Sequence, residues 1–288
     1  MNFSIQTDDL KMLRESVESD CARVRFGPEF CELKVPSLNL LKEAYSLVVG
    51  KGKEFVYVTP FFSDSGLKKI REHLAFLNDM GRIDVVVNDL GTLSLLKDYS
   101  NLKPHLGRQL VFTPARCPWP QITEKKMDSS AKSYVEELFY QTSLNYMPTI
   151  HFYQKRGVEG VDVDWIPKCF PNYESLAKSG LKLSLHPYLT PVTITRRCHT
   201  ARFVGEKSIE ACSRPCISKA YSLKHDSLGL DLALYGNVIF HIKIVSREDA
   251  KSLCNIDVAE LVISMNPITK IQNLEAINAA IKDLNSLF

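Results

Sequence analysis

The chain has 288 residues, of which 45% are hydrophobic and 24% are charged, with 13 Gly and 14 Pro. This ordinary composition excludes a disordered, collagen-like or coiled-coil protein. The length allows one large domain or two small ones, at roughly 100–200 residues per domain. The 36 Lys and Arg against 33 Asp and Glu leave a formal net charge of +3. So small an excess disfavours a broad nucleic-acid-binding surface, although it allows a local basic patch.

The sequence shows no sign of a membrane span or an export signal. No apolar run approaches the roughly 20 residues needed to cross a bilayer, and residues 1–15 lack the unbroken apolar stretch of a secretory signal. We therefore expect no membrane insertion and a cytoplasmic location. Eight cysteines in a long chain of this kind favour reduced thiols, or thiolates bound to a metal, over disulfides.

In the first half of the chain, short apolar strands alternate with helical segments. Residues 55–59 are β-branched and aromatic and lie between Gly52 and Pro60, which predicts a buried strand. Apolar side chains recur at helical spacing in residues 37–50, which predicts an amphipathic helix. Further strands are predicted over residues 23–26, 83–87 and 109–113, and further helices over residues 65–80 and 91–98. Residues 1–22 are interpreted as an N-terminal extension.

The second half of the chain is less regular. Residues 115–127 and 196–220 are predicted to be irregular. Residues 232–245 alternate like one or two antiparallel strands around Gly236–Asn237, which indicates a hairpin. The other predicted elements are strands over residues 149–154, 161–165, 181–185 and 258–265, and helices over residues 128–146, 172–179 and 269–286.

This element order predicts an α/β fold. About eight strands separated mostly by helices are typical of a TIM-like β/α barrel. Few helices are predicted over residues 185–245, so the expected barrel is incomplete or decorated. An open doubly wound sheet is the alternative, but no Gly-x-Gly-x-x-Gly follows the first predicted strand. We find no linker or repeat, so residues 1–288 are interpreted as one domain.

Three cysteines gather in the irregular segment, at Cys198, Cys212 and Cys216. A loop of this length can fold back on itself, so that all three sulfurs reach one ion or cluster. Metal binding requires deprotonated sulfur, and nearby cations lower the pKa of a thiol. Four arginines are close in sequence, at Arg196, Arg197, Arg202 and Arg214. The alternative is a chance gathering of free thiols, which behave as small hydrophobic residues; this is how Cys21 and Cys254 are interpreted.

Several motifs resemble one known family. They are Arg-Cys-His-Thr-Ala-Arg at 197–202, Leu-Ala-Leu-Tyr-Gly-Asn at 232–237, Arg-Phe-Gly at 25–27, Val-Asn-Asp-Leu-Gly at 87–91 and Gly-Arg-Gln-Leu at 107–110. Together they are similar to the collagenase-like peptidase family U-32, and in particular to its UbiV-type iron–sulfur branch of oxygen-independent hydroxylation. The resemblance spans about residues 23–265.

The resemblance implies a barrel fold and a [4Fe–4S] cluster held by four cysteines. Matched position by position, the implied ligands are Cys31, Cys198, Cys212 and Cys216. Cys31 is also expected at the site on physical grounds, because it follows the first predicted strand and barrel sites are built from the loops after strands. Cys117 and Cys169 are additional thiols that could compete as ligands.

Other candidates are catalytic or substrate-binding residues. Asn88 and Asp89 follow a predicted strand, where barrels carry catalytic groups, but Asp89 is equally suited to cap the next helix. Asp162 and Asp164 alternate with apolar residues, and face either the barrel interior or solvent. His186 and His199 are candidates to move protons at neutral pH, with a structural role as the alternative for each. Candidate substrate-binding residues are Arg108, Arg116, Arg197 and Arg202; Arg108 precedes a predicted strand, and a structural ion pair is its alternative role.

We therefore expect an iron–sulfur enzyme, or an obligate subunit of one, that modifies an aromatic or nucleobase substrate without dioxygen. The resemblance implies hydroxylation, with oxygen from an organic donor such as prephenate. A homologous U-32-like protein or a redox partner is expected, and a small aromatic substrate is favoured over RNA. The alternatives are a non-catalytic iron–sulfur scaffold for a paired homologue and a zinc-stabilised binding protein. Proteolysis is not expected, since the sequence has no His-Glu-x-x-His or Gly-x-Ser-x-Gly motif.

Overall fold

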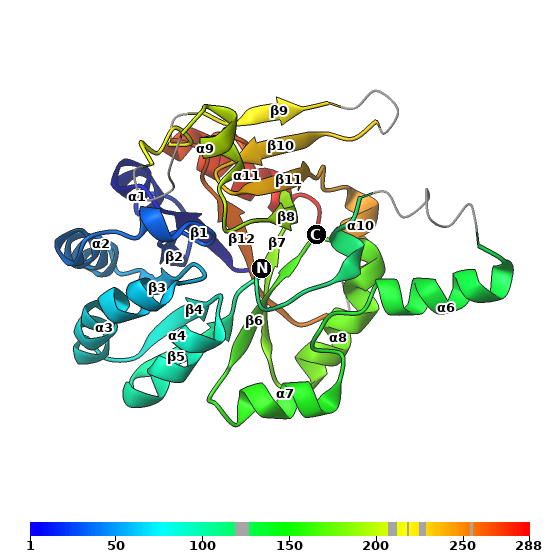
Figure 1. The fold of residues 1–288 in the computed structure, drawn as a ribbon, viewed down its shortest axis with the longest axis horizontal. Helices are drawn as coiled ribbons and strands as arrows, with labels where there is room; N and C mark the ends of the chain where they lie inside the picture. Colours follow the sequence, from blue (N-terminus) through cyan, green and yellow to red (C-terminus); the bar gives the residue numbers. More distant parts are fainter. Residues whose placement is uncertain (119–126, 207–211, 218, 225–228, 254–255) are drawn as a thin grey trace.

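Eight parallel strands close into a barrel in the computed structural model, which describes residues 1–118, 127–206, 212–217, 219–224, 229–253 and 256–288 (Figure 1). Their order around the barrel is β1-β12-β7-β6-β5-β4-β3-β2, and each adjacent pair is parallel. The predicted β/α barrel is thus confirmed. The strands are β1 (Phe3–Thr7), β2 (Arg23–Phe26), β3 (Glu54–Val58), β4 (Ile83–Val87), β5 (Leu102–Leu106), β6 (Gly160–Asp164), β7 (Lys182–His186) and β12 (Val258–Ser264).

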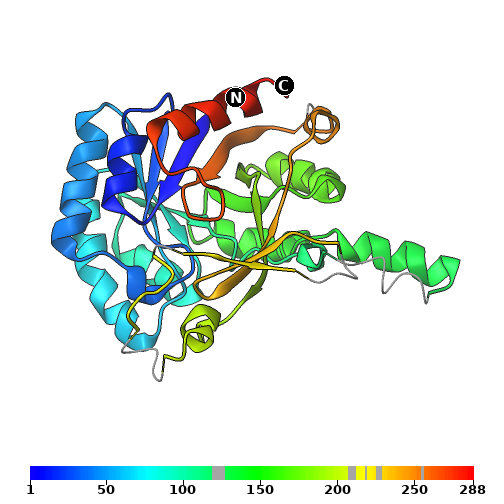
Figure 2. The same ribbon diagram turned by 90° about the horizontal axis from the view of Figure 1, so that it is seen from above.

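Helices surround the barrel on its outer side (Figures 1 and 2). Most begin at a polar cap; Asp9, Ser37 and Asn273, for example, each accept a hydrogen bond from a backbone N–H of the first turn. The helix α6 projects away from the body of the molecule in Figure 2 and buries none of its residues. The α-helices are α1 (Leu10–Ser16), α2 (Leu38–Gly50), α3 (Asp64–Asp79), α4 (Leu90–Leu95), α6 (Ser129–Phe139), α7 (Met147–Gln154), α8 (Phe170–Lys178), α9 (His199–Phe203), α10 (Arg247–Lys251) and α11 (Leu274–Asn285). Short 3-10 turns are η1 (Glu32–Lys34), η2 (Leu96–Asp98), η3 (Pro114–Arg116) and η4 (Pro167–Cys169).

A second, antiparallel sheet is inserted between β7 and β12. Its strands are β8 (Leu189–Ile194), β9 (Tyr221–Leu223), β10 (Leu232–Tyr235) and β11 (Val238–Ile242), in the order β8-β11-β10-β9. The β10–β11 hairpin turns at Gly236–Asn237, as predicted, with a φ of +59° at Gly236. The Asn237 side chain donates hydrogen bonds to the carbonyl oxygens of Phe30, after β2, and Thr195, after β8. This sheet therefore decorates the end of the barrel where the parallel strands terminate.

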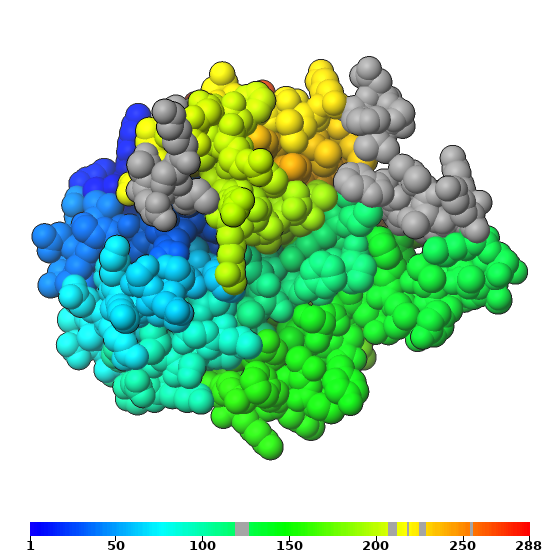
Figure 3. Space-filling view, viewed as in Figure 1, coloured from blue at the N-terminus to red at the C-terminus, as the bar shows by residue number. Residues whose placement is uncertain are grey.

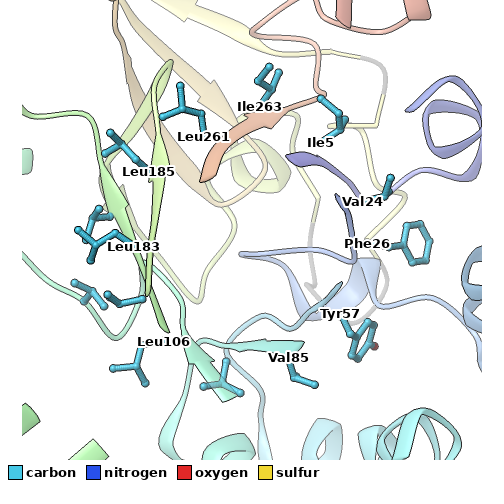
Figure 4. Packing of buried hydrophobic residues seen from close by; sticks show 14 of the residues in the cluster. Ile5, Val24, Phe26, Tyr57, Val85, Leu106, Leu183, Leu185, Leu261 and Ile263 are labelled. Carbon is cyan, nitrogen blue, oxygen red and sulfur yellow. The ribbon is translucent and has the colours of Figure 1, made fainter. Parts of the chain in front are cut away.

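Apolar side chains on the outer face of the strands form the main core. Figure 4 shows Ile5, Val24, Tyr57, Leu185 and Ile263 among those arranged around the barrel, where they meet the helices. All five are 0% exposed, and each alternates with inward residues on its strand. Burying this ring of branched and aromatic side chains against the helices is the main stabilising contribution to the fold.

Charged side chains, by contrast, fill much of the barrel interior. Arg25 of β2 forms an ion pair with Asp162 of β6, and its other terminal nitrogen lies 3.4 Å from Glu260 Oε1 of β12. All three are at most 2% exposed. Asp162 and Asp164 thus face the interior and not solvent, which resolves the alternatives left by the sequence. An interior of this kind is held by paired charges, and removing one partner leaves the other buried without compensation.

Several sequence predictions are wrong in detail. Residues 1–22 are not an extension, because β1 pairs with both β12 and β2 and closes the barrel. Residues 109–113 are a turn after β5, which itself lies at Leu102–Leu106. Residues 149–154 fall in the helix α7, with Ile150 and Tyr153 buried at helical spacing. The helix predicted over residues 128–146 ends at Phe139.

Candidate functional site

A chain of buried ion pairs spans the mouth of the barrel, at the carboxyl ends of its strands. Arg108 Nε and Nη2 each lie 2.7 Å from a carboxylate oxygen of Glu29, and its Nη1 lies 3.0 Å from Asp164 Oδ1. Arg116 Nε donates to Asp164 Oδ2 at 2.6 Å. Burial alone would raise the pKa of Asp164, but the positive charges of Arg116 and Arg108 outweigh it, so that pKa is lowered. The network fixes the loops after β2, β5 and β6 to one another.

The prediction that Arg108 precedes a strand is wrong. Arg108 follows β5 and lies at the mouth, because β5 ends at Leu106. Its guanidinium also donates to the Leu189 carbonyl oxygen at 2.6 Å, so it is fully buried among acceptors. This geometry favours the structural ion pair over direct substrate binding for Arg108. Arg116 is also buried and paired.

His186 ends β7 beside the interior ion pairs. Its Nε2 lies 3.2 Å from Asp162 Oδ2, whose carboxylate also pairs with Arg25. Burial, followed by the positive charge of Arg108, lowers the pKa of His186. The ring is therefore neutral at pH 7, and its Nε2–H donates a hydrogen bond to the Asp162 carboxylate. Its Nδ1 is then a buried acceptor without a partner among the described residues.

These pKa shifts predict a stability that falls as the solution becomes more acidic. His73, His105 and His186 have lowered pKa values in the folded state, chiefly through burial. The unfolded chain therefore binds more protons below about pH 6.5, and stability declines from there. Asp162 and Asp164 also have lowered pKa values, which adds a second decline below about pH 4. Urea unfolding at pH 7, 5.5 and 4 checks this; a constant free energy of unfolding would contradict it.

Asn88 and Asp89 serve structural contacts in this fold. Asn88 Nδ2 donates to the Thr59 carbonyl oxygen at 2.7 Å, and its Oδ1 accepts from the Gln109 backbone N–H at 3.0 Å. Asp89 Oδ1 accepts from the Thr92 backbone N–H at 2.6 Å, as the N-cap of α4. The other oxygen of Asp89 accepts from the Thr92 hydroxyl at 2.8 Å. The capping alternative is the one that these contacts favour.

The four cysteines implied by the resemblance lie in one neighbourhood. The turn at Gly236–Asn237 joins their segments: Asn237 Nδ2 donates to the carbonyl oxygen of Phe30, the neighbour of Cys31, at 2.9 Å, and the Gly236 carbonyl oxygen accepts from the Thr200 N–H, two residues after Cys198, at 3.0 Å. The Sγ of Cys216 lies beside Gly236. Burial raises the pKa of Cys31 to about 11. Cys198 and Cys216 are buried, whereas Cys31 and Cys212 are partly exposed. Segments far apart in the sequence, one after β2 and one around α9, thus converge on the same place.

Backbone and amine groups surround these sulfurs. Cys198 caps α9, and its Sγ accepts from the Ala201 N–H at 3.4 Å. Cys212 Sγ accepts from the Arg214 N–H at 3.4 Å. Burial raises the pKa of Cys31, Cys198 and Cys216, and the Lys34 ammonium offsets this rise only in part. Donors and positive charge of this kind stabilise thiolates.

The number and type of the donor side chains bear on which metal group fits this site. In the described part of the chain, no three His, Cys, Asp or Glu side chains lie close enough together to hold a single metal ion. A tetrahedral zinc site would need four such donors around one ion. In a [4Fe–4S] cluster each thiolate binds a different iron, so the sulfurs stand further apart. Four cysteine thiols are the type of donor that such a cluster requires.

The other predicted residues lie around this site without joining it. His199 is the first residue of α9 and is partly buried, and Arg197 and Arg202 are exposed. Cys169 is buried, with its Sγ 3.9 Å from the Thr113 hydroxyl oxygen, and burial raises its pKa to about 11. Cys117 is partly exposed. Cys21 is buried, as predicted, and Cys254 lies outside the described residues.

A small cavity beside the ion-pair network is lined by Glu29 and the predicted substrate-binding residue Arg108, and also by residues that the sequence analysis missed. Lys34 Nζ lies 2.9 Å from both Asp8 Oδ2 and the Tyr235 hydroxyl, and Asp8 and Tyr235 line the cavity. Gln6 also lines it, donating to Glu29 Oε2 at 3.1 Å. Recognising β1 as a barrel strand would have drawn attention to Gln6 and Asp8. Tyr235 belongs to the Leu-Ala-Leu-Tyr-Gly-Asn motif at 232–237, but the motif does not indicate a role for this residue, and Lys34 carries no motif signal.

Fold and site together define an eight-stranded α/β-barrel protein with buried ion pairs and four neighbouring thiols at its mouth. No helix among the described residues has the length and apolar character to span a membrane. No family model and no curated protein matches the sequence.

Solved structures similar to this chain include three with low identity. Thiamine phosphate pyrophosphorylase from Pyrococcus furiosus is 7% identical, with 99% of this chain and 96% of that one covered and a TM-score of 0.45. The U32 peptidase Mk0906 is 13% identical, with 92% and 93% covered and a TM-score of 0.45. Dihydropteroate synthase from Thermus thermophilus, in complex with 4-aminobenzoate, is 10% identical, with 99% and 93% covered and a TM-score of 0.41. These values assign neither a family nor an activity.

Proposed function

We propose that the protein binds a [4Fe–4S] cluster through Cys31, Cys198, Cys212 and Cys216, and takes part in oxygen-independent hydroxylation or a related modification of an aromatic or nucleobase substrate. The observation that carries the proposal is that the turn at Gly236–Asn237 brings together the segments of Cys31, Cys198 and Cys216, which are far apart in the sequence. The motifs that resemble those of the UbiV-type branch of family U-32 imply the same ligand set and the hydroxylation.

The surroundings of the thiols suit such a group. A cubane with four thiolates carries a net charge near −2, and the largely buried Lys34 ammonium lies near three of the four sulfurs. Backbone N–H groups of Ala201 and Arg214 donate to sulfur, and such hydrogen bonds tune the potential of a cluster. When bound, the cluster would supply one-electron chemistry.

The chain's own side chains offer a place for a small substrate. The cavity beside Asp8 and Tyr235 has a volume of about 60 Å³, where a single buried water needs about 10–15 Å³. It therefore suits a small molecule, or one ring of a larger one, better than an extended RNA strand. A recess lined by His186 and Leu189 adjoins it.

Metal analysis after anaerobic purification tests the cluster directly. We expect about four irons and four acid-labile sulfides per chain, as a [4Fe–4S] cluster requires. Cys198→Ala should lose most of this iron, because one of the thiolates is removed, whereas the control Cys117→Ala should retain it. Zinc without sulfide, or equal iron in both variants, would contradict the proposal.

A second candidate is a non-catalytic scaffold whose cluster supports a paired homologue. All four thiols are used in the proposed cluster, so no iron is left with an obvious open position for substrate. Turnover measured with the purified chain alone separates the two candidates, since activity without a partner eliminates the scaffold. Co-purification from the native host would show whether a homologous protein or a redox protein accompanies it.

A further inference from the structure

Positive charge is concentrated on the segment that carries three of the cysteines. Residues 195–224 contain seven Lys and Arg but only two Glu, whereas the whole chain has a formal net charge of only +3. The rest of the chain is therefore net negative. In Figure 3 the described residues of this segment, coloured yellow-green to yellow, cover the upper middle of the face shown. Such a charge asymmetry steers the approach of a charged partner.

The described basic side chains of this segment are available to a partner. All six are exposed, and none forms an ion pair with a residue that the structure describes. The described acidic residue, Glu206, accepts hydrogen bonds from the Ser213 N–H and hydroxyl. We call these six residues the basic face: Arg196, Arg197, Arg202, Arg214, Lys219 and Lys224.

Side-chain contacts hold the parts of the basic face together. The Phe203 ring, at the end of α9, packs edge-on against Tyr221 of β9, with centroids 4.9 Å apart. The bonds from Ser213 to Glu206 join the loop of Cys212 to the end of α9. Arg202, Arg214 and Lys219 are therefore parts of one surface, which covers the buried Cys198 and Cys216.

Exposed apolar side chains interrupt the basic face. Phe203 is 67% exposed, Ile217 is 52% exposed and Val204 is 43% exposed. Ile217 directly follows Cys216, and α9 runs from its cap at Cys198 to Phe203. Exposed apolar side chains among charged ones are typical of a protein–protein interface.

A nucleic acid fits this surface less well. Binding of single strands relies on several free aromatic faces for stacking. Here Arg196 covers Phe61 at 4.2 Å and Lys219 lies over Tyr221 at 5.0 Å, which leaves Phe203 as the exposed ring among these three. The aliphatic side chains of Val204 and Ile217 offer nothing to phosphate groups. The observations favour an acidic protein that brings apolar side chains of its own.

We propose that the basic face docks a small acidic electron-transfer protein, which delivers single electrons to the site of Cys198, Cys212 and Cys216. This rests on the proposed function, because the acceptor is the cluster. The carrier loses one electron and the cluster gains it, and no bond or proton is transferred. Weak, charge-steered contacts of this kind are typical of redox encounters.

Stopped-flow reduction of the anaerobic, iron-containing protein by a pre-reduced plant-type [2Fe–2S] ferredoxin tests the proposal. We expect Arg202→Glu/Lys219→Glu to lower the second-order rate at low salt by about tenfold or more, and added salt to lower the rate of the unaltered chain. The matched control is Lys97→Glu/Lys155→Glu, which makes the same charge change at the opposite end of the barrel and should leave the rate unaltered.

Two further measurements distinguish docking on the basic face from a loss of folding or of the cluster. Iron content and direct reduction by photoreduced 5-deazaflavin should be equal in both double variants, which shows that folding and the cluster are intact. Equal ferredoxin rates in the two variants would overturn the proposal. The proposal would also be overturned if single-stranded RNA bound the unaltered chain but not Arg202→Glu/Lys219→Glu, while the ferredoxin rates of the two double variants stayed equal. If the chain holds no iron, the proposed function fails. Calorimetry of ferredoxin binding then still tests docking on the basic face.

Discussion

Replacing Glu29 by Gln is expected to lower the free energy of unfolding by about 3 kcal/mol or more. Glu29 is 5% exposed, and both of its carboxylate oxygens accept from Arg108 at 2.7 Å. A glutamine keeps the shape but removes the charge, and its amide NH₂ would face one N–H of the guanidinium. The arginine would then be buried with Asp164 as its remaining counter-charge, and Asp164 is already shared with Arg116.

Urea unfolding at pH 7 measures this effect, with Glu43→Gln as the matched control. Glu43 pairs with Arg14 at 2.6 Å, but both side chains are about half exposed, so its loss should cost roughly 0–1 kcal/mol. The double variant Glu29→Leu/Arg108→Met should recover part of the stability, because no unpaired charge then remains at that position. Equal effects of Glu29→Gln and Glu43→Gln would show that the network adds no stability.

Where the sequence pattern matches the local structure, prediction of the strands succeeds. Strands β2, β4 and β6 have alternating or apolar sequences, and their bounds match the predicted ones within a residue. Strand β5, Leu-Lys-Pro-His-Leu, escapes prediction because Lys103, Pro104 and His105 interrupt the apolar signal. His105 Nε2 lies 3.4 Å from Asp84 Oδ2 in the barrel interior. An interior built from charges removes the alternation on which strand prediction depends.

Residues 149–154 show the opposite error. Their β-branched and aromatic side chains favour a strand, but they form α7, in which Ile150 and Tyr153 face the core one turn apart. Local propensity is a weak guide when either periodicity fits a short apolar run. Packing against the body of the protein decides such a segment, and packing is not visible in the sequence.

The candidate site shows the same limit. The four cysteines can be singled out from spacing and from motif resemblance, and they do lie near one another. Their role as ligands stays a prediction. By contrast, Lys34, Asp8 and Tyr235 meet through three separate elements, and no spacing in the sequence relates them. Arg108 is singled out from the sequence. However, the strand is predicted at residues 109–113 and not at Leu102–Leu106, which places Arg108 at the wrong end of the barrel.

Replacing Ile5 by Asp is expected to lower the free energy of unfolding by more than about 4 kcal/mol, a large part of the roughly 5–15 kcal/mol that keeps a typical protein folded. Ile5 is 0% exposed in the middle of β1, level with Ile263 of β12 and Val24 of β2. An aspartate there would bury a charge among apolar side chains with no partner. Because β1 bonds to both neighbours, the damage extends to the closure of the barrel.

The matched control is Asn2→Asp, which adds the same charge near the start of the chain on an exposed side chain and should leave the melting temperature nearly unaltered. Ile5→Val keeps the fold measurable, with an expected loss of about 0.5–1.5 kcal/mol for one buried methylene. Circular dichroism and soluble yield distinguish the three variants. If residues 1–22 were the extension that their sequence indicates, Ile5→Asp would be as harmless as Asn2→Asp. A folded, stable Ile5→Asp chain would therefore show that the barrel does not depend on β1 for its closure.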